Sequence, residues 1–153
     1  MTRENKTAKY DRIVAQLEEL YLKTPDPIAR MATASALLKG KFKYFFWVGF
    51  YRLVGGELTV GPYQGALACQ VLKKHTGVCW AAIDRGETVL VPDVEAFPGH
   101  IACDSRSRSE VVVPLRDRDG RIWAVLDVDS DELDSFDADD VAGLKKVAAL
   151  IDP

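Results

Sequence analysis

The chain has 153 residues, of which 48% are hydrophobic, and this is the size of one domain with one substantial core. Its 20 basic and 23 acidic residues are interspersed and give a net charge of -3, so no basic stripe predicts nucleic-acid binding. The sequence has no apolar run of signal-peptide or membrane-spanning length, and we expect a cytoplasmic protein that binds neither membrane nor nucleic acid.

Two helices are predicted in residues 1–40. Residues 10–22 place apolar side chains at helical spacing, with charged residues on the opposite face. After a break, Asp26 and Pro27 predict the N-cap and first turn of a second helix, which Gly40 ends.

Residues 44–130 then change to the pattern of a sheet. Strands are expected over residues 44–53, 57–60, 66–72, 88–91, 110–115 and 121–128, with a short helix over 77–82. Gly-Gly at 55–56 separates the first two strands as in a hairpin, and Asp-Gly at 119–120 forms the turn between the last two. The polar run 92–109, which is rich in turn-forming residues, is expected to be an ordered functional loop.

A closing helix over residues 136–151 completes the pattern, because its apolar residues return to one face. Strands gathered in a block with helices at both ends predict an α+β fold. We expect a single domain over residues 1–153, in which the N-terminal helices (1–40) and the closing helix pack on one side of a central antiparallel sheet (44–130).

The three cysteines are the first candidates for chemistry. Cys69, Cys79 and Cys103 stand in a chain expected in a reducing compartment, where grouped thiols indicate redox chemistry rather than structural disulfides. Cys103 lies in a polar turn, where packing gives little reason for a thiol. Cys69, on an expected apolar strand, and Cys79 can also be small hydrophobic core residues.

Zinc is an alternative use of the same residues, since the three cysteines and His100 could supply a Cys3His set. Structural zinc sites usually pair their ligands as C-x2-4-C, and no two cysteines of this chain are that close. We therefore predict no metal site.

Acidic residues in apolar strands are the second group of candidates. Asp127 and Asp129 alternate along a strand, so both carboxyl groups should project from one face. Their repulsion and partial burial should raise at least one pKa and leave a proton for a substrate. Glu110 opens another apolar strand. The alternative for Asp129, with Ser130, is a cap or turn at the strand's end.

Six motifs follow one another along the chain. They are GPYQG at 61–65, GVC at 77–79, VPDV at 91–94, FPGHIACDS at 97–105, SEVVVP at 109–114 and VLDVDS at 125–130. In order and spacing they resemble the motifs of free methionine-(R)-sulfoxide reductase, a family built on the GAF fold. The resemblance extends from the first helix to the closing helix.

The resemblance implies reduction of free L-methionine (R)-S-oxide to L-methionine, with no cofactor. It implies that Cys103 attacks the sulfoxide sulfur and becomes a sulfenic acid, which Cys69 resolves as an intramolecular disulfide. Thioredoxin would then reduce that disulfide, and Cys79 would be a further member of the thiol exchange.

The substrate-binding residues also follow from the resemblance. Glu110, Asp127 and Asp129 would polarise the sulfoxide and hold the ammonium group, with Glu110 as the acid. Trp47 matches the tryptophan that lines the methyl pocket in the family, and Tyr51 and Trp80 are the other candidate aromatics. Without the resemblance, a tryptophan on a strand is more often a core residue.

Two other functions stay open. One is a GAF domain that senses a small ligand without catalysis, and the other is a cysteine redox switch without a small-molecule substrate. A homodimer is a further expectation, because the first helix has an apolar face and GAF domains commonly pair through terminal helices.

Overall fold

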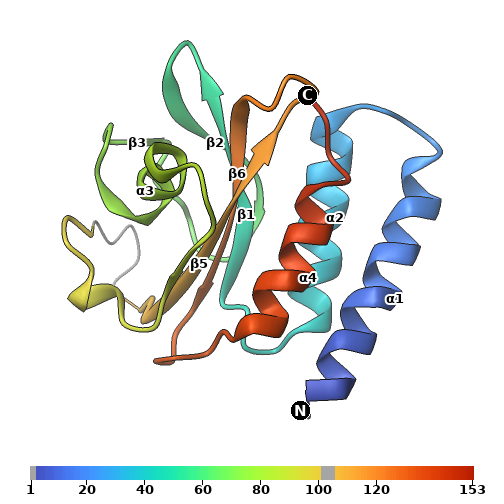
Figure 1. Cartoon of the computed structure of the whole chain (residues 1–153), viewed down its shortest axis with the longest axis horizontal. Helices are drawn as coiled ribbons and strands as arrows, with labels where there is room; N and C mark the ends of the chain where they lie inside the picture. The colour runs from blue at the N-terminus through green and yellow to red at the C-terminus, as the bar shows by residue number, and fades with distance from the viewer. Residues whose placement is uncertain (1–2, 101–105) are drawn as a thin grey trace.

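The computed structural model describes residues 3–100 and 106–153, which form an antiparallel sheet with helices on both faces (Figure 1). The helices are α1 (Arg3–Tyr21), α2 (Pro27–Lys41), α3 (Gly77–Arg85) and α4 (Ala138–Ala148), with a short 3-10 helix η1 (Val94–Ala96). The strands are β1 (Trp47–Val54), β2 (Glu57–Gln64), β3 (Val71–Leu72), β4 (Val89–Val91), β5 (Ser109–Arg116) and β6 (Ile122–Ser130).

The six strands stand in the order β3-β2-β1-β6-β5-β4, and all neighbours are antiparallel. The predicted α+β fold with a central antiparallel sheet is confirmed. In the described part of the chain, no helix has the length and apolar character needed to cross a membrane.

The terminal helices cover one face of the sheet, as predicted (Figure 1). α2 contacts β1 and β2, α4 contacts β5, and α1 packs against both helices as an outer layer. The strands supply this core with alternate residues such as Phe50 of β1 and Leu126 and Val128 of β6, all of them fully buried. This face is therefore a dry hydrophobic core.

A buried polar network joins α1 to α4 at the edge of that core. Asp140 is fully buried and accepts hydrogen bonds from Lys6 Nζ at 2.9 Å, Tyr10 Oη at 2.8 Å and Tyr44 Oη at 2.6 Å. Asp137 is the N-cap of α4 and forms a reciprocal capping box with Asp140. The network fixes the start of the last helix against the first.

The opposite face carries α3 and a smaller apolar cluster (Figure 1). Trp47 and Tyr51 of β1 project to this side, as do Asp127 and Asp129 of β6, because they alternate with the core residues of the other face. α3 ends at Gly86, whose φ of 68° is the left-handed conformation that glycine adopts without strain. One face of the same strands thus builds the core and the other builds a site.

The predicted third strand over residues 66–72 is wrong, since β3 contains only Val71 and Leu72. Gly65 has a φ of 136°, which turns the chain out of the sheet. The carbonyl of Ala66 then accepts a hydrogen bond from the Trp47 indole at 3.0 Å instead of a bond in a strand ladder. Cys69 therefore lies in a loop.

Smaller differences concern the ends of the elements. α1 begins at Arg3 rather than at residue 10, and β2 continues to Gln64 rather than ending at residue 60. β1 begins at Trp47 rather than at residue 44, because the preceding aromatic residues form a turn that packs into the helix-covered core. The predicted N-cap of α2 is confirmed, since the Asp26 side chain accepts a hydrogen bond from Ala29 N at 3.0 Å.

Candidate active site

A pocket of about 220 Å³ lies on the α3 face of the sheet. Its walls come from β1, segment 67–73, the first turn of α3, β5 and β6. Among the described residues, those that were predicted for the site and line this pocket are Trp47, Cys69, Cys79, Glu110, Asp127 and Asp129. Cys103 lies outside the described residues. Thiol, carboxyl and aromatic side chains therefore share one cavity.

The register of the sheet brings the acidic residues together. Asp129 of β6 pairs with Glu110 of β5. Asp127 lies two residues before Asp129 and projects from the same face of β6. All three are buried, with exposed fractions of 6% for Glu110, 5% for Asp127 and 9% for Asp129. Asp129 lies inside the ladder, whereas Ser130 Oγ accepts a hydrogen bond from Glu132 N and takes part in the turn that follows.

Burial changes the proton affinity of these acids. Burial, and then the negative charges of Asp127 and Asp129, raise the pKa of Glu110 well above its usual range. Burial also raises the pKa of Asp127, while hydrogen bonds with Glu110, Cys79 and Asp129 lower it in part. The direction agrees with the prediction from the sequence, and Glu110 can hold a proton at neutral pH.

Cys79 stands in the first turn of α3 and is a buried, free thiol. Burial, together with the charges of Asp127, Glu110 and Asp129, raises its pKa well above the usual value. The side chain also hydrogen-bonds with Asp127. At neutral pH it is therefore a protonated thiol and a weak nucleophile.

Cys69 is disulfide-bonded and lines the same pocket from the loop before β3. It is only partly buried, so the alternative that it is a core residue of an apolar strand is wrong. The arrangement places an oxidisable sulfur at the edge of the acidic cavity.

An aromatic stack forms the apolar wall. Trp47 stacks between Tyr51 and Tyr63, with ring centroids 5.8 Å and 5.2 Å away. Gly49 makes this approach feasible, because a Cβ there would lie 2.2 Å from the Cβ of Tyr63. Since the Trp47 indole also donates to Ala66 O, the wall is tied to the loop that carries Cys69.

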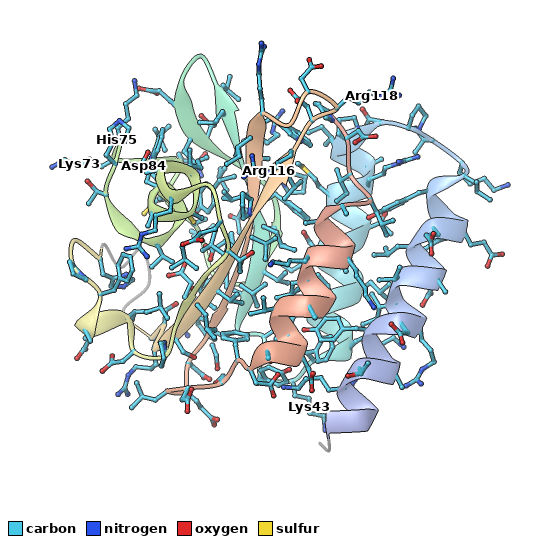
Figure 2. All side chains as sticks on the ribbon, in the orientation of Figure 1. Lys43, Lys73, His75, Asp84, Arg116 and Arg118 are labelled. Atoms are coloured by element: carbon cyan, nitrogen blue, oxygen red, sulfur yellow. The ribbon has the colours of Figure 1, made fainter. Side chains whose placement is uncertain are left out.

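Trp80 is not among the described residues that line the pocket. Its indole donates to Leu72 O at 3.3 Å, and its ring contacts His75 at a centroid distance of 5.0 Å. Figure 2 shows His75 beside Lys73 and Asp84 at the α3 end of the molecule. Trp80 therefore holds the loop before α3 and does not line the cavity.

Several lining residues were missed by the sequence analysis. Phe46 precedes Trp47, and Lys73, Thr76 and Gly77 form the approach to α3. Thr76 is the N-cap of α3 but makes no hydrogen bond with its side chain to the helix. A threonine before a helical run is a cap signal, although only the fold shows that this helix start faces a cavity. His100 also lines the pocket, and burial lowers its pKa.

The cavity also holds a set of metal-ligating atoms. Cys79, Glu110 and Asp127 each offer one ligand atom, and these atoms lie within 4.8 Å of one another. The described residues thus combine a proton donor, an acidic wall, an apolar wall and a sulfur that is already oxidised. This combination suits a small zwitterionic substrate with an apolar end and a reducible group.

Comparison with known proteins gives the family. The model of the GAF domain matches residues 10–152. GAF domain-containing protein A of Dictyostelium discoideum is 44% identical over 153 residues, which cover 99% of this chain and 96% of that protein. The free methionine-R-sulfoxide reductase of Escherichia coli is 36% identical over 148 residues, which cover 97% of this chain and 89% of that enzyme.

A solved structure agrees with these relatives. The free methionine-R-sulfoxide reductase of Neisseria meningitidis, determined in complex with its substrate, superposes with a TM-score of 0.90 at 44% identity. The match covers 95% of this chain and 87% of that one. The chain therefore belongs to the GAF domain family and, within it, to the free methionine-R-sulfoxide reductases.

Proposed function

We propose that this chain reduces free L-methionine (R)-S-oxide to L-methionine by thiol chemistry. The observation that carries the proposal is the pocket in which disulfide-bonded Cys69 meets the buried acids Glu110, Asp127 and Asp129. Relatives named for this activity are 36% and 44% identical to this chain over most of its length. A ligand sensor would require the cavity, but only thiol chemistry accounts for a disulfide-bonded cysteine in its wall.

The first step joins a thiolate to the sulfoxide sulfur. The Cys103 thiolate attacks the sulfur while Glu110 gives one proton to the sulfoxide oxygen. The bond between that oxygen and the methionine sulfur then breaks, the hydroxyl group passes to Cys103, and methionine leaves with the electron pair on its sulfur, so that Cys103 becomes a sulfenic acid. The raised pKa of Glu110 supports its role, because the acid keeps its proton to a higher pH than an ordinary glutamate. No cofactor enters this scheme.

The second step forms a disulfide. The Cys69 thiol condenses with the sulfenic acid, and water leaves. The structure has Cys79 as a free thiol and Cys69 in a disulfide, and the partner that we propose for Cys69, from the family resemblance, is Cys103. Cys79 enters the thiol exchange later than the others, because its raised pKa makes it a poor thiolate.

Specificity for the free amino acid would come from contacts with the ammonium and carboxylate groups of methionine sulfoxide. Its ammonium group would bind the acidic wall of Asp127 and Asp129, and its methyl group would contact Trp47. Its carboxylate would lie at the opposite wall, near Lys73 and the α3 N-terminus, where Thr76 leaves backbone donors without a side-chain cap. Methionine sulfoxide amide, which has no carboxylate, should therefore be a poor substrate.

Three further parts of the proposal concern the cell and the assembly. Thioredoxin is the proposed dithiol reductant of the Cys69 disulfide, and the cytoplasm is the proposed location. A homodimer through the terminal helices is the proposed assembly.

The test is a single turnover without a recycling system. Reduced enzyme is mixed with each diastereomer of free methionine sulfoxide, and released methionine and remaining thiols are counted. About one methionine per chain from the R form, none from the S form and loss of two thiols are expected from the scheme. No methionine from either form would instead favour the ligand sensor, and thiol loss under peroxide alone would favour the redox switch.

Two variants separate the thiol roles. Cys103→Ser should abolish the single turnover. Cys69→Ser should retain it and lose thioredoxin-driven recycling. Equal loss in both variants would contradict this division of roles.

A further inference from the structure

Three metal-ligating atoms converge at the bottom of the pocket. Cys79 comes from α3, Glu110 from β5 and Asp127 from β6, so the fold itself brings them together. Their ligand atoms lie within 4.8 Å of one another, and all three residues are buried. The set combines one sulfur with two carboxylate oxygens, which is unlike a surface cluster of acids.

A second observation concerns one oxygen atom of this cluster. Asp127 Oδ1 is buried and has no hydrogen-bond partner in the part of the chain that the structure describes. Asp127 is only 5% exposed and lines the cavity. A buried carboxyl oxygen without a donor is costly, and a cation that enters the cavity would satisfy it.

The geometry suits a small ion after modest closure. With Zn–S near 2.3 Å and Zn–O near 2.0–2.2 Å, the ligand atoms of a tetrahedral site lie about 3.5 Å apart. The distances between the ligand atoms, which are at most 4.8 Å, therefore have to shorten by roughly 1 Å to hold a zinc ion. The proposal therefore requires the Glu110 and Cys79 side chains to rotate toward Asp127.

The combination of one thiolate with two carboxylates favours one class of ion. Mg²⁺ and Ca²⁺ take six or more oxygen ligands and gain nothing from a thiolate. Zn²⁺, Co²⁺ and Cd²⁺ accept sulfur and oxygen together and can complete the site with a water molecule. An all-oxygen ion would leave Cys79 unused.

We propose that Cys79, Glu110 and Asp127 bind a divalent borderline cation such as Zn²⁺, which excludes methionine sulfoxide from the pocket. On binding, the thiol and the carboxyl groups release their protons to solvent, and no redox change occurs. The ion is an inhibitor rather than a cofactor, because it occupies the acids that the substrate needs. This second half rests on the proposed function, whereas the binding itself does not.

Co²⁺ is the most informative probe, because its bond to a thiolate gives charge-transfer absorption. The protein is kept in the form in which Cys69 is disulfide-bonded, so that Cys79 is the free thiol. One Co²⁺ per chain with a thiolate charge-transfer band is expected for the wild type. Cys79→Ser should lose the band, and Asp127→Asn should weaken binding at least tenfold.

His75→Asn is the matched control. His75 Nδ1 lies 3.0 Å from Asp84 in an exposed pair that offers an imidazole and a carboxylate but no thiol (Figure 2). The variant should bind Co²⁺ with an unchanged band. A band that survives Cys79→Ser, or that disappears in His75→Asn, would overturn the site.

Competition tests the inhibitory role. The oxidised protein cannot turn over, so free methionine (R)-sulfoxide at ten times its own Kd should raise the apparent Kd of Co²⁺ about tenfold. An unchanged Kd in a chain that reduces the sulfoxide when metal-free would contradict exclusion of the substrate. A chain that binds Co²⁺ through Cys79 but releases no methionine would refute the proposed function and leave the metal site standing.

Discussion

Asp140 and Asp127 are both buried aspartates, but they lie on opposite faces of the sheet and in different surroundings. Asp140 accepts hydrogen bonds from Lys6 Nζ, Tyr10 Oη and Tyr44 Oη at 2.6–2.9 Å. Asp127 Oδ1 has no hydrogen-bond partner among the described residues. A buried carboxyl group whose two oxygens are both paired with residues of the fold serves the fold, whereas one with an oxygen left unpaired in a cavity can accept a hydrogen bond or a charge from a ligand.

The comparison also shows how one strand supports both sides. Leu126 and Val128 of β6 are fully buried in the helix-covered core, and Asp127 and Asp129 between them face the pocket. The apolar side stabilises the sheet enough to hold acidic residues in an unfavourable environment on the other side. Core and site are thus separated by alternation within a strand rather than by different elements.

Among the substitutions on the pocket face, Glu110→Gln should cause the largest loss of activity. The amide keeps the size of the side chain but cannot give the sulfoxide oxygen a proton of comparable acidity. Removal of a general acid typically costs about 10²–10⁴-fold in rate, so single-turnover methionine formation should fall by that factor. Rapid-quench assay of free methionine measures it.

Asp140→Asn is the control for this substitution on the other face, and it should retain the single-turnover rate per folded chain. A Glu110→Gln enzyme that keeps more than half of its rate would refute the assignment of Glu110 as the acid.

On the helix-covered face, Asp140→Ala should lower the free energy of unfolding. The substitution leaves Lys6 and two tyrosine hydroxyl groups without their common acceptor. Removal of one partner from a buried ion pair costs about 3–5 kcal/mol, and we expect a loss of unfolding free energy in this range. Urea denaturation measures it. A loss below about 1 kcal/mol, the value of an exposed ion pair, would show that the network does not hold α1 to α4.

The pH dependence of stability sharpens the contrast. Glu110 and Asp127 have raised pKa values in the folded chain and ordinary values of about 4.3 and 3.9 when unfolded. Above these unfolded values the native state binds more protons, so wild-type stability should fall as pH rises toward the folded pKa values.

Glu110→Gln removes one of these groups and should melt a few degrees above the wild type at neutral pH, by about 2–4 °C for each kcal/mol. Thermal melts across mildly acidic to neutral pH measure the difference. Glu57→Gln, at an exposed position beside the β1–β2 turn, should follow the wild type. Equal pH slopes for Glu110→Gln and wild type would contradict a protonated Glu110.

Trp47→Phe should have the smallest effect. Phenylalanine keeps an aromatic wall but loses the hydrogen bond of 3.0 Å to Ala66 O. A net hydrogen bond contributes about 1 kcal/mol, so KM for the sulfoxide should rise about fivefold through the loosened loop. Steady-state kinetics with a dithiol reductant measure it, and Trp123→Phe on the helix-covered side should leave KM unchanged. Equal KM values for both variants would contradict the role of the Trp47 wall.

Some of this organisation could be predicted from the sequence because it is local. The alternation of Asp127 and Asp129 in an apolar strand predicts that both project from one face of the strand. The helix start at Asp26 follows from its cap chemistry. Such features depend on neighbours within a few residues.

Other features depend on contacts between distant residues and could not be predicted. The chain turns out of the sheet at Gly65, and a hydrogen bond from the Trp47 indole to Ala66 O ties the loop that carries Cys69 to β1. The partners of Asp140 include Lys6 and Tyr10, which lie more than a hundred residues earlier in the chain. No local pattern distinguishes Asp140, which Lys6 and two tyrosines pair, from Asp127, whose Oδ1 has no hydrogen-bond partner among the described residues.

The most direct test of the contrast between the two faces is infrared spectroscopy of the folded protein at neutral pH. A protonated carboxylic acid has a C=O stretching band that a carboxylate lacks. We predict that the wild type shows this band, that Glu110→Gln removes it and that Asp140→Asn retains it. A wild type without the band at neutral pH, or a band that persists in Glu110→Gln, would contradict a pocket acid that holds its proton for the sulfoxide.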